Sequence, residues 1–273
     1  MTLIEKFQAF GLSYHYDHLT TAISHCGPLT GKRVFEIGGC LPREIVCDEL
    51  GASMWLGIDH SDYWEISGDD NPSNRIGVPR APLDGFYFGD AEHICLDGDI
   101  LNLPASFMQA FDFVFSTSAL EHVADLKGTL QIAANLLKRG GSFFAVAMPI
   151  WPSSRGHHLP PITCDNESFS FLNPPFPDWA HLTMDAEEMI EELSRWLPHE
   201  TARQIAYMCY ESPHINRAFV EDYEEAFLLA PFSERNLIRV PDRPIAGDIR
   251  EKIISRHGEH RLDQYGICLS AVR

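Results

Sequence analysis

Short hydrophobic runs alternate with helix-like segments from about residue 33 to residue 148. The runs that predict strands begin with "RVFEIGG" and end with "SFFAVAMP"; between them lie "MWLGIDHS", "HICLDGDI" and "FDFVFSTS". Segments with helical spacing, "REIVCDELGA" and "LKGTLQIAANLLKRGG", are each closed by glycine. Strands and helices that take turns predict an α/β fold, a doubly wound and mainly parallel sheet with its sites at the carboxyl ends of the strands.

The flanking regions break this rhythm and divide the chain into four parts. Residues 1–32 predict a helical segment that covers the site, and 33–149 the Rossmann-like core. Residues 150–261 predict a cap and substrate region with remaining core elements, and 262–273 the final core strand. Within the cap region, "DAEEMIEELSRW" and "AFVEDYEEAFLLA" predict helices, whereas "TARQIAYMCYES" looks like a strand. Residues 61–90, rich in Gly, Pro and Asp, predict an ordered loop inserted in the core.

Composition narrows the class of partner. The 273 residues carry 39 acids against 21 Lys and Arg, a net charge of -18, which opposes binding to nucleic acid or to an anionic membrane. The seven cysteines contain no CxxC pair and indicate reduced thiols in a cytoplasmic protein. No signal peptide and no membrane-length apolar segment is evident.

The turn "FEIGGCLPR" indicates a ligand-binding site. Two glycines after a strand let a ligand approach the backbone, but Glu36 precedes them and a carboxylate would repel a pyrophosphate. A ligand with a cationic end, or one rich in hydroxyls and amines, suits this turn better.

The chain resembles the class I S-adenosylmethionine-dependent methyltransferases of the small-molecule, type 11-like group. The resemblance rests on "VFEIGG", "LGIDHS", "DGDI" and "FDFVFSTSALEHV", followed by "LLKRGGSFFAVAMP", in the family's order and approximate spacing. It covers roughly residues 33–149 and implies a Rossmann-like methyltransferase fold that uses S-adenosyl-L-methionine. The family's third glycine is replaced by Leu41 or Pro42, which leaves the path of the turn open.

The resemblance also implies roles for the cofactor residues. Asp59 would accept the ribose hydroxyls, Asp99 the adenine amino group, and the Ile100 amide would read the ring. Gly38 and Gly39 would let the methionine end pass, with Glu36 holding it indirectly or through the turn. The carbonyl of Ser116 would accept from the methionine ammonium. The full expected set is Glu36, Gly38, Gly39, Asp59, Asp99, Ile100 and Ser116.

Histidines are the candidates for chemistry. His122 in "ALEHV" is expected beyond the fourth strand, facing the cleft, as a base for a hydroxyl or amine proton. Glu121 is expected to point away from it, as a helical neighbour would. His157 is a second catalytic candidate. The expected substrate-binding residues are Tyr14, His15, Arg155, His158 and His181. No metal site is predicted, since adjacent histidines seldom converge on one ion.

Two other accounts fit parts of the sequence. A protein that binds S-adenosylmethionine without transferring its methyl group would keep the same cofactor residues. A nicotinamide-dependent oxidoreductase would need a G-x-G-x-x-G turn, which this chain lacks, and gives Asp99 no role. The leading hypothesis is a methyltransferase acting on O, N or C of a small molecule, in secondary metabolism or in the modification of polysaccharide precursors; oligomeric state is left open.

Overall fold

The computed structural model describes residues 1–62, 77–87, 89 and 91–273. Most of the loop expected over 61–90 lies outside these residues. Its described part holds β3 (Arg80–Pro82). None of the described helices is long and apolar enough to cross a membrane. All seven cysteines are free.

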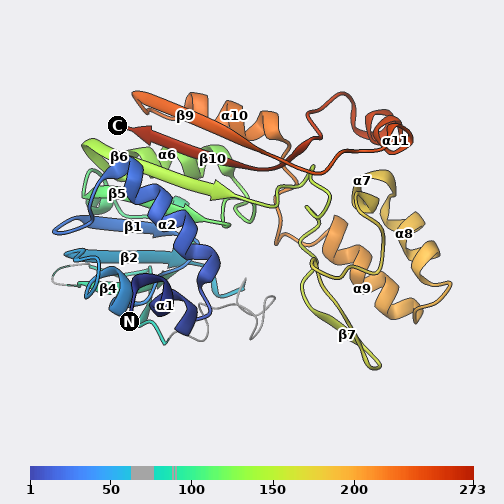
Figure 1. The fold of residues 1–273 in the computed structure, drawn as a ribbon, viewed down its shortest axis with the longest axis horizontal. Helices are drawn as coiled ribbons and strands as arrows, with labels where there is room; N and C mark the ends of the chain where they lie inside the picture. Colours follow the sequence, from blue (N-terminus) through green and yellow to red (C-terminus); the bar gives the residue numbers. More distant parts are fainter. Residues whose placement is uncertain (63–76, 88, 90) are drawn as a thin grey trace.

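Eight of the described strands form one large mixed sheet. Its order is β3-β4-β2-β1-β5-β6-β10-β9, parallel from β3 to β6, with β10 antiparallel to β6 and β9 antiparallel to β10 (Figure 1). The remaining strands of this sheet are β1 (Arg33–Ile37), β2 (Met54–Asp59), β4 (His93–Asp97), β5 (Phe111–Thr117), β6 (Leu137–Ala147), β9 (Glu234–Pro241) and β10 (Gln264–Val272). The predicted α/β doubly wound fold is confirmed.

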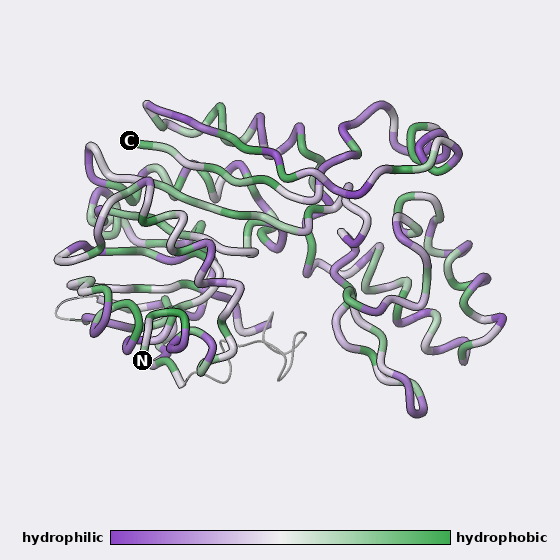
Figure 2. The backbone as a smooth tube through the Cα atoms, viewed as in Figure 1, coloured by the Kyte–Doolittle hydropathy of each residue, from purple (hydrophilic) through white to green (hydrophobic). Residues whose placement is uncertain are grey.

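Helices cover both faces of the sheet, which explains why the central strands are hydrophobic almost throughout (Figure 2). One face packs against α6 (Leu126–Leu136) and α10 (Val220–Leu229). The other face packs against α1 (Leu3–Ala9), α2 (Ser13–Cys26) and the short α3 (Arg43–Val46). The N-terminal segment is therefore part of the core layer.

The region after β6 builds a separate cluster beyond the end of the sheet where β6 finishes (Figure 1). It contains a small hairpin and four helices among the described residues. Their bounds are β7 (Ile162–Cys164), β8 (Glu167–Phe169), α7 (Ala180–Thr183), α8 (Ala186–Leu193), α9 (His199–Tyr210) and α11 (Gly247–His257).

One prediction of secondary structure was wrong. The segment "TARQIAYMCYES" is not a strand but belongs to α9. Its buried residues are Ala202, Ile205, Ala206, Met208 and Cys209, and this spacing of three and four places them on one helical face. The alternation of Ile205, Tyr207 and Cys209 resembled a strand, yet Tyr207 is half exposed.

Candidate functional site

A pocket opens where the strand order reverses. β1 lies between β2 and β5. The chain runs from β1 to β2 on one side and from β5 to β6 on the other, which leaves a crevice at the ends of β1 and β5. The cavity there measures about 350 Å³. The residues that follow β1, β2, β4 and β5 line it, and Pro213 and His214 come from the region after α9.

Four aspartates are among the residues that line the pocket. Asp59 at the end of β2 and Asp99 after β4 both line it, as do Asp62 and Asp125. The described lining residues include no Lys or Arg. An acidic pocket without cations suits a ligand with positive charge and hydroxyl or amino groups.

Asp99 and Asp59 each accept a hydrogen bond from a nearby backbone amide. Its Oδ1 accepts from the Leu101 amide at 2.9 Å and caps the 3-10 turn η2 (Ile100–Asn102). The backbone N–H of His60 donates to Asp59 Oδ1 at 2.8 Å. Each carboxylate is thus held by the backbone beside it, and the Oδ1 contacts orient both groups at the pocket wall.

The glycine turn after β1 forms another part of the wall. Gly38 lines the pocket with a φ of 86°, and a Cβ built there would lie 1.9 Å from the Cβ of Ala119. The turn must therefore lack a side chain at this position. Gly39 pairs with Ile58 on β2, which holds the turn against the neighbouring strand.

Glu36 supports the turn through buried hydrogen bonds. It is buried and does not line the pocket; its Oε2 accepts from the Leu41 amide at 2.8 Å and from the Trp55 indole at 2.5 Å. Burial raises the pKa of this carboxyl to about 7, while the two hydrogen bonds oppose that rise. The indirect role expected of Glu36 matches this placement.

Ser116 does not lie where the sequence placed it. It is buried within β5, its hydroxyl donates to the Ile37 carbonyl at 3.0 Å, and it does not line the pocket. The strand runs one residue further, to Thr117, so Ser118 is the serine that reaches the cavity. Ser118 has a φ of 49° and its Oγ lies 2.8 Å from the Tyr14 hydroxyl.

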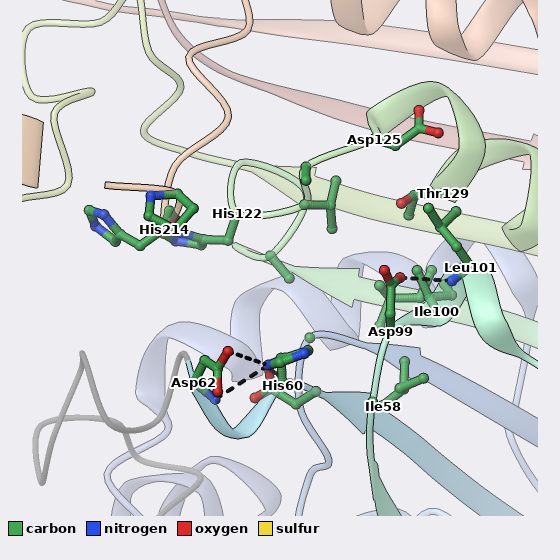
Figure 3. Close-up of a pocket in the computed structure, with 18 of the residues that line it drawn as sticks. Ile58, His60, Asp62, Asp99, Ile100, Leu101, His122, Asp125, Thr129 and His214 are labelled. Carbon is green, nitrogen blue, oxygen red and sulfur yellow. Dashed lines mark hydrogen bonds and ion pairs between the residues drawn. The ribbon is translucent and has the colours of Figure 1, made fainter. Parts of the chain in front are cut away.

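Two of the lining histidines, His122 and His214, lie at one end of the pocket (Figure 3). Figure 3 shows His122 and His214 together at one end, away from Asp99 and Asp125. His122 Nδ1 hydrogen-bonds the carbonyl of His214. Burial, with His158 close by, holds the pKa of His122 well below its usual value, so the ring is neutral at pH 7.

The expectation for Glu121 was wrong. It does not sit on a helix but in a turn after β5, and it is fully buried beside His122 rather than directed away. Its Oε1 accepts from the Met148 amide at 3.2 Å. Removal from water raises the pKa of the Glu121 carboxyl to about 8.

The adjacent pair His157 and His158 point to different surroundings. His157 is buried against Phe176 and His181, its Nδ1 accepts from the Leu159 amide at 3.1 Å, and it does not line the pocket. His158 instead packs edge-on against His122, with 4.8 Å between ring centres. Of the two catalytic candidates, the structure brings only His122 to the cavity.

The remaining substrate candidates do not line the pocket either. Tyr14 touches it indirectly through Ser118, and His15 follows Tyr14 on α2. Arg155 donates to the Leu172 carbonyl at 3.0 Å, away from the cavity. His181 is buried with its Nε2 2.9 Å from the Trp151 carbonyl.

Residues 81–145 match a family model described as a methyltransferase domain. A search of curated proteins gave no match.

Solved structures with similarity to this chain include three methyltransferases. An S-adenosylmethionine-dependent methyltransferase from Mesorhizobium loti is 16% identical, with 93% of this chain and 96% of that chain covered and a TM-score of 0.46. Phosphoethanolamine N-methyltransferase 2 from Haemonchus contortus, in complex with S-adenosyl-L-methionine, is 13% identical, with 94% and 52% covered and a TM-score of 0.48. Geranyl diphosphate C-methyltransferase from Streptomyces coelicolor A3(2) is 12% identical, with 95% and 79% covered and a TM-score of 0.47.

The family match spans β4, β5 and α6, the elements that carry Asp99 and His122 into the pocket. The strand order is that of a Rossmann-like fold, and residues 81–145 are similar to a methyltransferase domain.

Proposed function

We propose that this enzyme methylates O, N or C of a small molecule, in secondary metabolism, with the acceptor bound at the histidine end of the pocket. The observation that carries the proposal is the polarity of the cavity: carboxylates at the strand tips, and the neutral His122 with His214 at the other end. Pro213 and His214, which follow α9, make part of the wall, so residues outside the core bound the acceptor end. A concave site of about 350 Å³ favours a small acceptor over a macromolecular surface.

S-adenosyl-L-methionine supplies an electrophilic methyl carbon on a sulfonium. Asp59 is proposed to hold the ribose hydroxyls, and Asp99 with the Ile100 amide the adenine. Gly38 and Gly39 leave room beside the turn that Glu36 supports. The sequence assigned the carbonyl of Ser116 as the acceptor for the methionine ammonium. We assign this role instead to a carbonyl of the Ser118 segment, because Ser118 lines the cavity.

His122 is the proposed catalytic residue. A neutral imidazole has a nitrogen lone pair that can receive the acceptor's proton as the acceptor bonds to the methyl carbon and the carbon–sulfur bond breaks. The hydrogen bond to the His214 carbonyl fixes the ring. His157 is not proposed as a base, since Phe176 and His181 enclose it.

The test is transfer of a labelled methyl group to a panel of small hydroxyl, amine and enol compounds. The parent enzyme should label at least one acceptor and release S-adenosylhomocysteine. His122→Ala should lower kcat about 100-fold or more while cofactor binding stays unchanged. His199→Ala, at an exposed site on α9, is the matched control and should behave as the parent. Tight cofactor binding with no labelled product in any compound would support the non-methylating account.

Location and partners belong to the same proposal. The free thiols support a cytoplasmic enzyme. The charge of -18 supports a small-molecule substrate rather than nucleic acid or a membrane surface.

A further inference from the structure

Glu121, His122 and His158 bring one ligand atom each to within 4.8 Å of one another. Glu121 and His122 come from the turn after β5, and His158 from the loop after β6. Glu121 is fully buried, and its Oε2 has no hydrogen-bond partner among the described residues. A buried carboxylate oxygen without a partner is costly, so its presence calls for a ligand.

Both imidazoles are anchored through one nitrogen. His122 bonds the carbonyl of His214 through Nδ1, and His158 bonds the carbonyl of Pro149 through Nε2. A ring nitrogen that bonds a carbonyl carries the proton, so each lone pair is on the other nitrogen, Nε2 of His122 and Nδ1 of His158. Metal-binding histidines commonly show this arrangement, because the outer carbonyl fixes both the tautomer and the orientation of the ring.

The position of His158 is held from several sides. Its backbone adopts a φ of 44°, its carbonyl accepts from His214 Nε2 at 2.8 Å, and its ring stacks on Phe171. Non-glycine residues seldom take such a φ, and where they do the surrounding structure enforces it. The fold therefore orients this imidazole toward His122 and Glu121.

We propose that Glu121, His122 and His158 bind a divalent first-row transition-metal ion, with Zn²⁺ as the reference. Two imidazoles and one carboxylate form a donor set that leaves a coordination position open. Because His122 lines the pocket, the open position would face the acceptor end. This location, though not the binding of the ion, rests on the proposed function.

The ion changes what His122 does. With its lone pair on the metal, the imidazole does not take the acceptor's proton, so the role of base proposed above applies to the ion-free enzyme. A hydroxyl bound at the open position would have a lowered pKa and would lose its proton to water. Its oxygen would then attack the methyl carbon as the carbon–sulfur bond breaks and S-adenosylhomocysteine leaves, while the ion keeps its oxidation state. The sequence-based expectation of no metal considered His157 with His158; in the structure His158 instead meets residues from another loop.

The experiment is titration of the purified chain with Co²⁺, followed by visible absorption, with neither cofactor nor acceptor present. The parent should bind about one equivalent and develop ligand-field bands. Glu121→Gln and His158→Gly should each weaken binding by roughly tenfold or more. Glycine is chosen because it tolerates the φ of His158, and glutamine because it keeps an acceptor for Met148.

His199→Ala is the control and should titrate as the parent, and thermal melts should show that each variant folds. If one variant fails to fold, the other decides. Parent protein without Co²⁺ bands, or folded variants that bind as tightly as the parent, would overturn the site. Co²⁺ binding without methyl transfer would instead count against the proposed function, and methyl transfer without Co²⁺ binding against the metal alone.

Discussion

At the scale of single residues, the two aspartates at the strand tips should decide cofactor affinity. Asp59→Asn and Asp99→Asn remove a charge but keep the shape, and asparagine can still cap the turn at residue 99. Each should weaken binding of S-adenosylhomocysteine by about 1.5–3 kcal/mol, roughly 10- to 150-fold, by calorimetry. Asp248→Asn, an exposed acid on α11, is the control. Unchanged affinity in both aspartate variants would place the ligand elsewhere.

Glu36 is a residue whose role is structural support for the turn. Because one oxygen accepts from both Leu41 and Trp55, Glu36→Gln can keep both bonds, whereas Glu36→Ala leaves two buried donors without an acceptor. The alanine variant should lose about 1–3 kcal/mol of unfolding free energy for each donor. Urea unfolding measures this loss, and a glutamine variant as unstable as the alanine one would contradict the account.

The raised pKa of Glu36 adds a pH signature to that comparison. Its folded value is about 7 against 4.5 unfolded, so the folded state binds the extra proton between these values. Its contribution to stability is therefore present at low pH and lost as pH rises through that window. Glu36→Gln should remove this component of the pH dependence.

At the scale of elements, the turn after β1 depends on contact with the loop after β5. Gly38→Ala adds a Cβ 1.9 Å from Ala119, so one of the two segments must move. We expect weaker cofactor binding and a lower melting temperature. Gly140→Ala is the matched control: its φ is 76°, but nothing lies within 4 Å of the added Cβ. It should lose about 1–2 kcal/mol to backbone strain and keep its affinity. Equal effects in both variants would argue against the contact.

Which elements could be predicted follows from where their apolar residues lie. β1, β2 and β5 are buried on both faces and read as continuous hydrophobic runs. β9 was not predicted, since this edge strand is mostly exposed and its sequence is largely polar. Asp59, Asp99 and His122 were predicted near a site because sites gather at strand ends, and all three line the pocket. His214 was not, because only the tertiary fold brings its loop, after α9, to the pocket.

At the scale of the whole molecule, buried neutral histidines connect the region beyond the sheet to the core, and they should make stability depend on pH. His181 on α7 lies 2.9 Å from the Trp151 carbonyl, and burial lowers its pKa to about 4. His257 and His158, when charged, disfavour its protonation further.

The pKa of His181 in the unfolded chain is 6.5. Between pH 6.5 and 4 the unfolded state therefore binds a proton that the folded state does not bind. The unfolding free energy should therefore decrease as the pH is lowered through this window, by about 1.4 kcal/mol per pH unit for each such histidine. His181→Gln should have a shallower slope, by about one proton, in urea unfolding measured at several pH values. His199→Gln, at an exposed site, should keep the parent slope. If the unfolding free energy depends on pH equally in the parent and in His181→Gln, protonation of this histidine is not coupled to unfolding. A shallower dependence in His181→Gln alone would assign the acid sensitivity to the contact between α7 and the loop after β6.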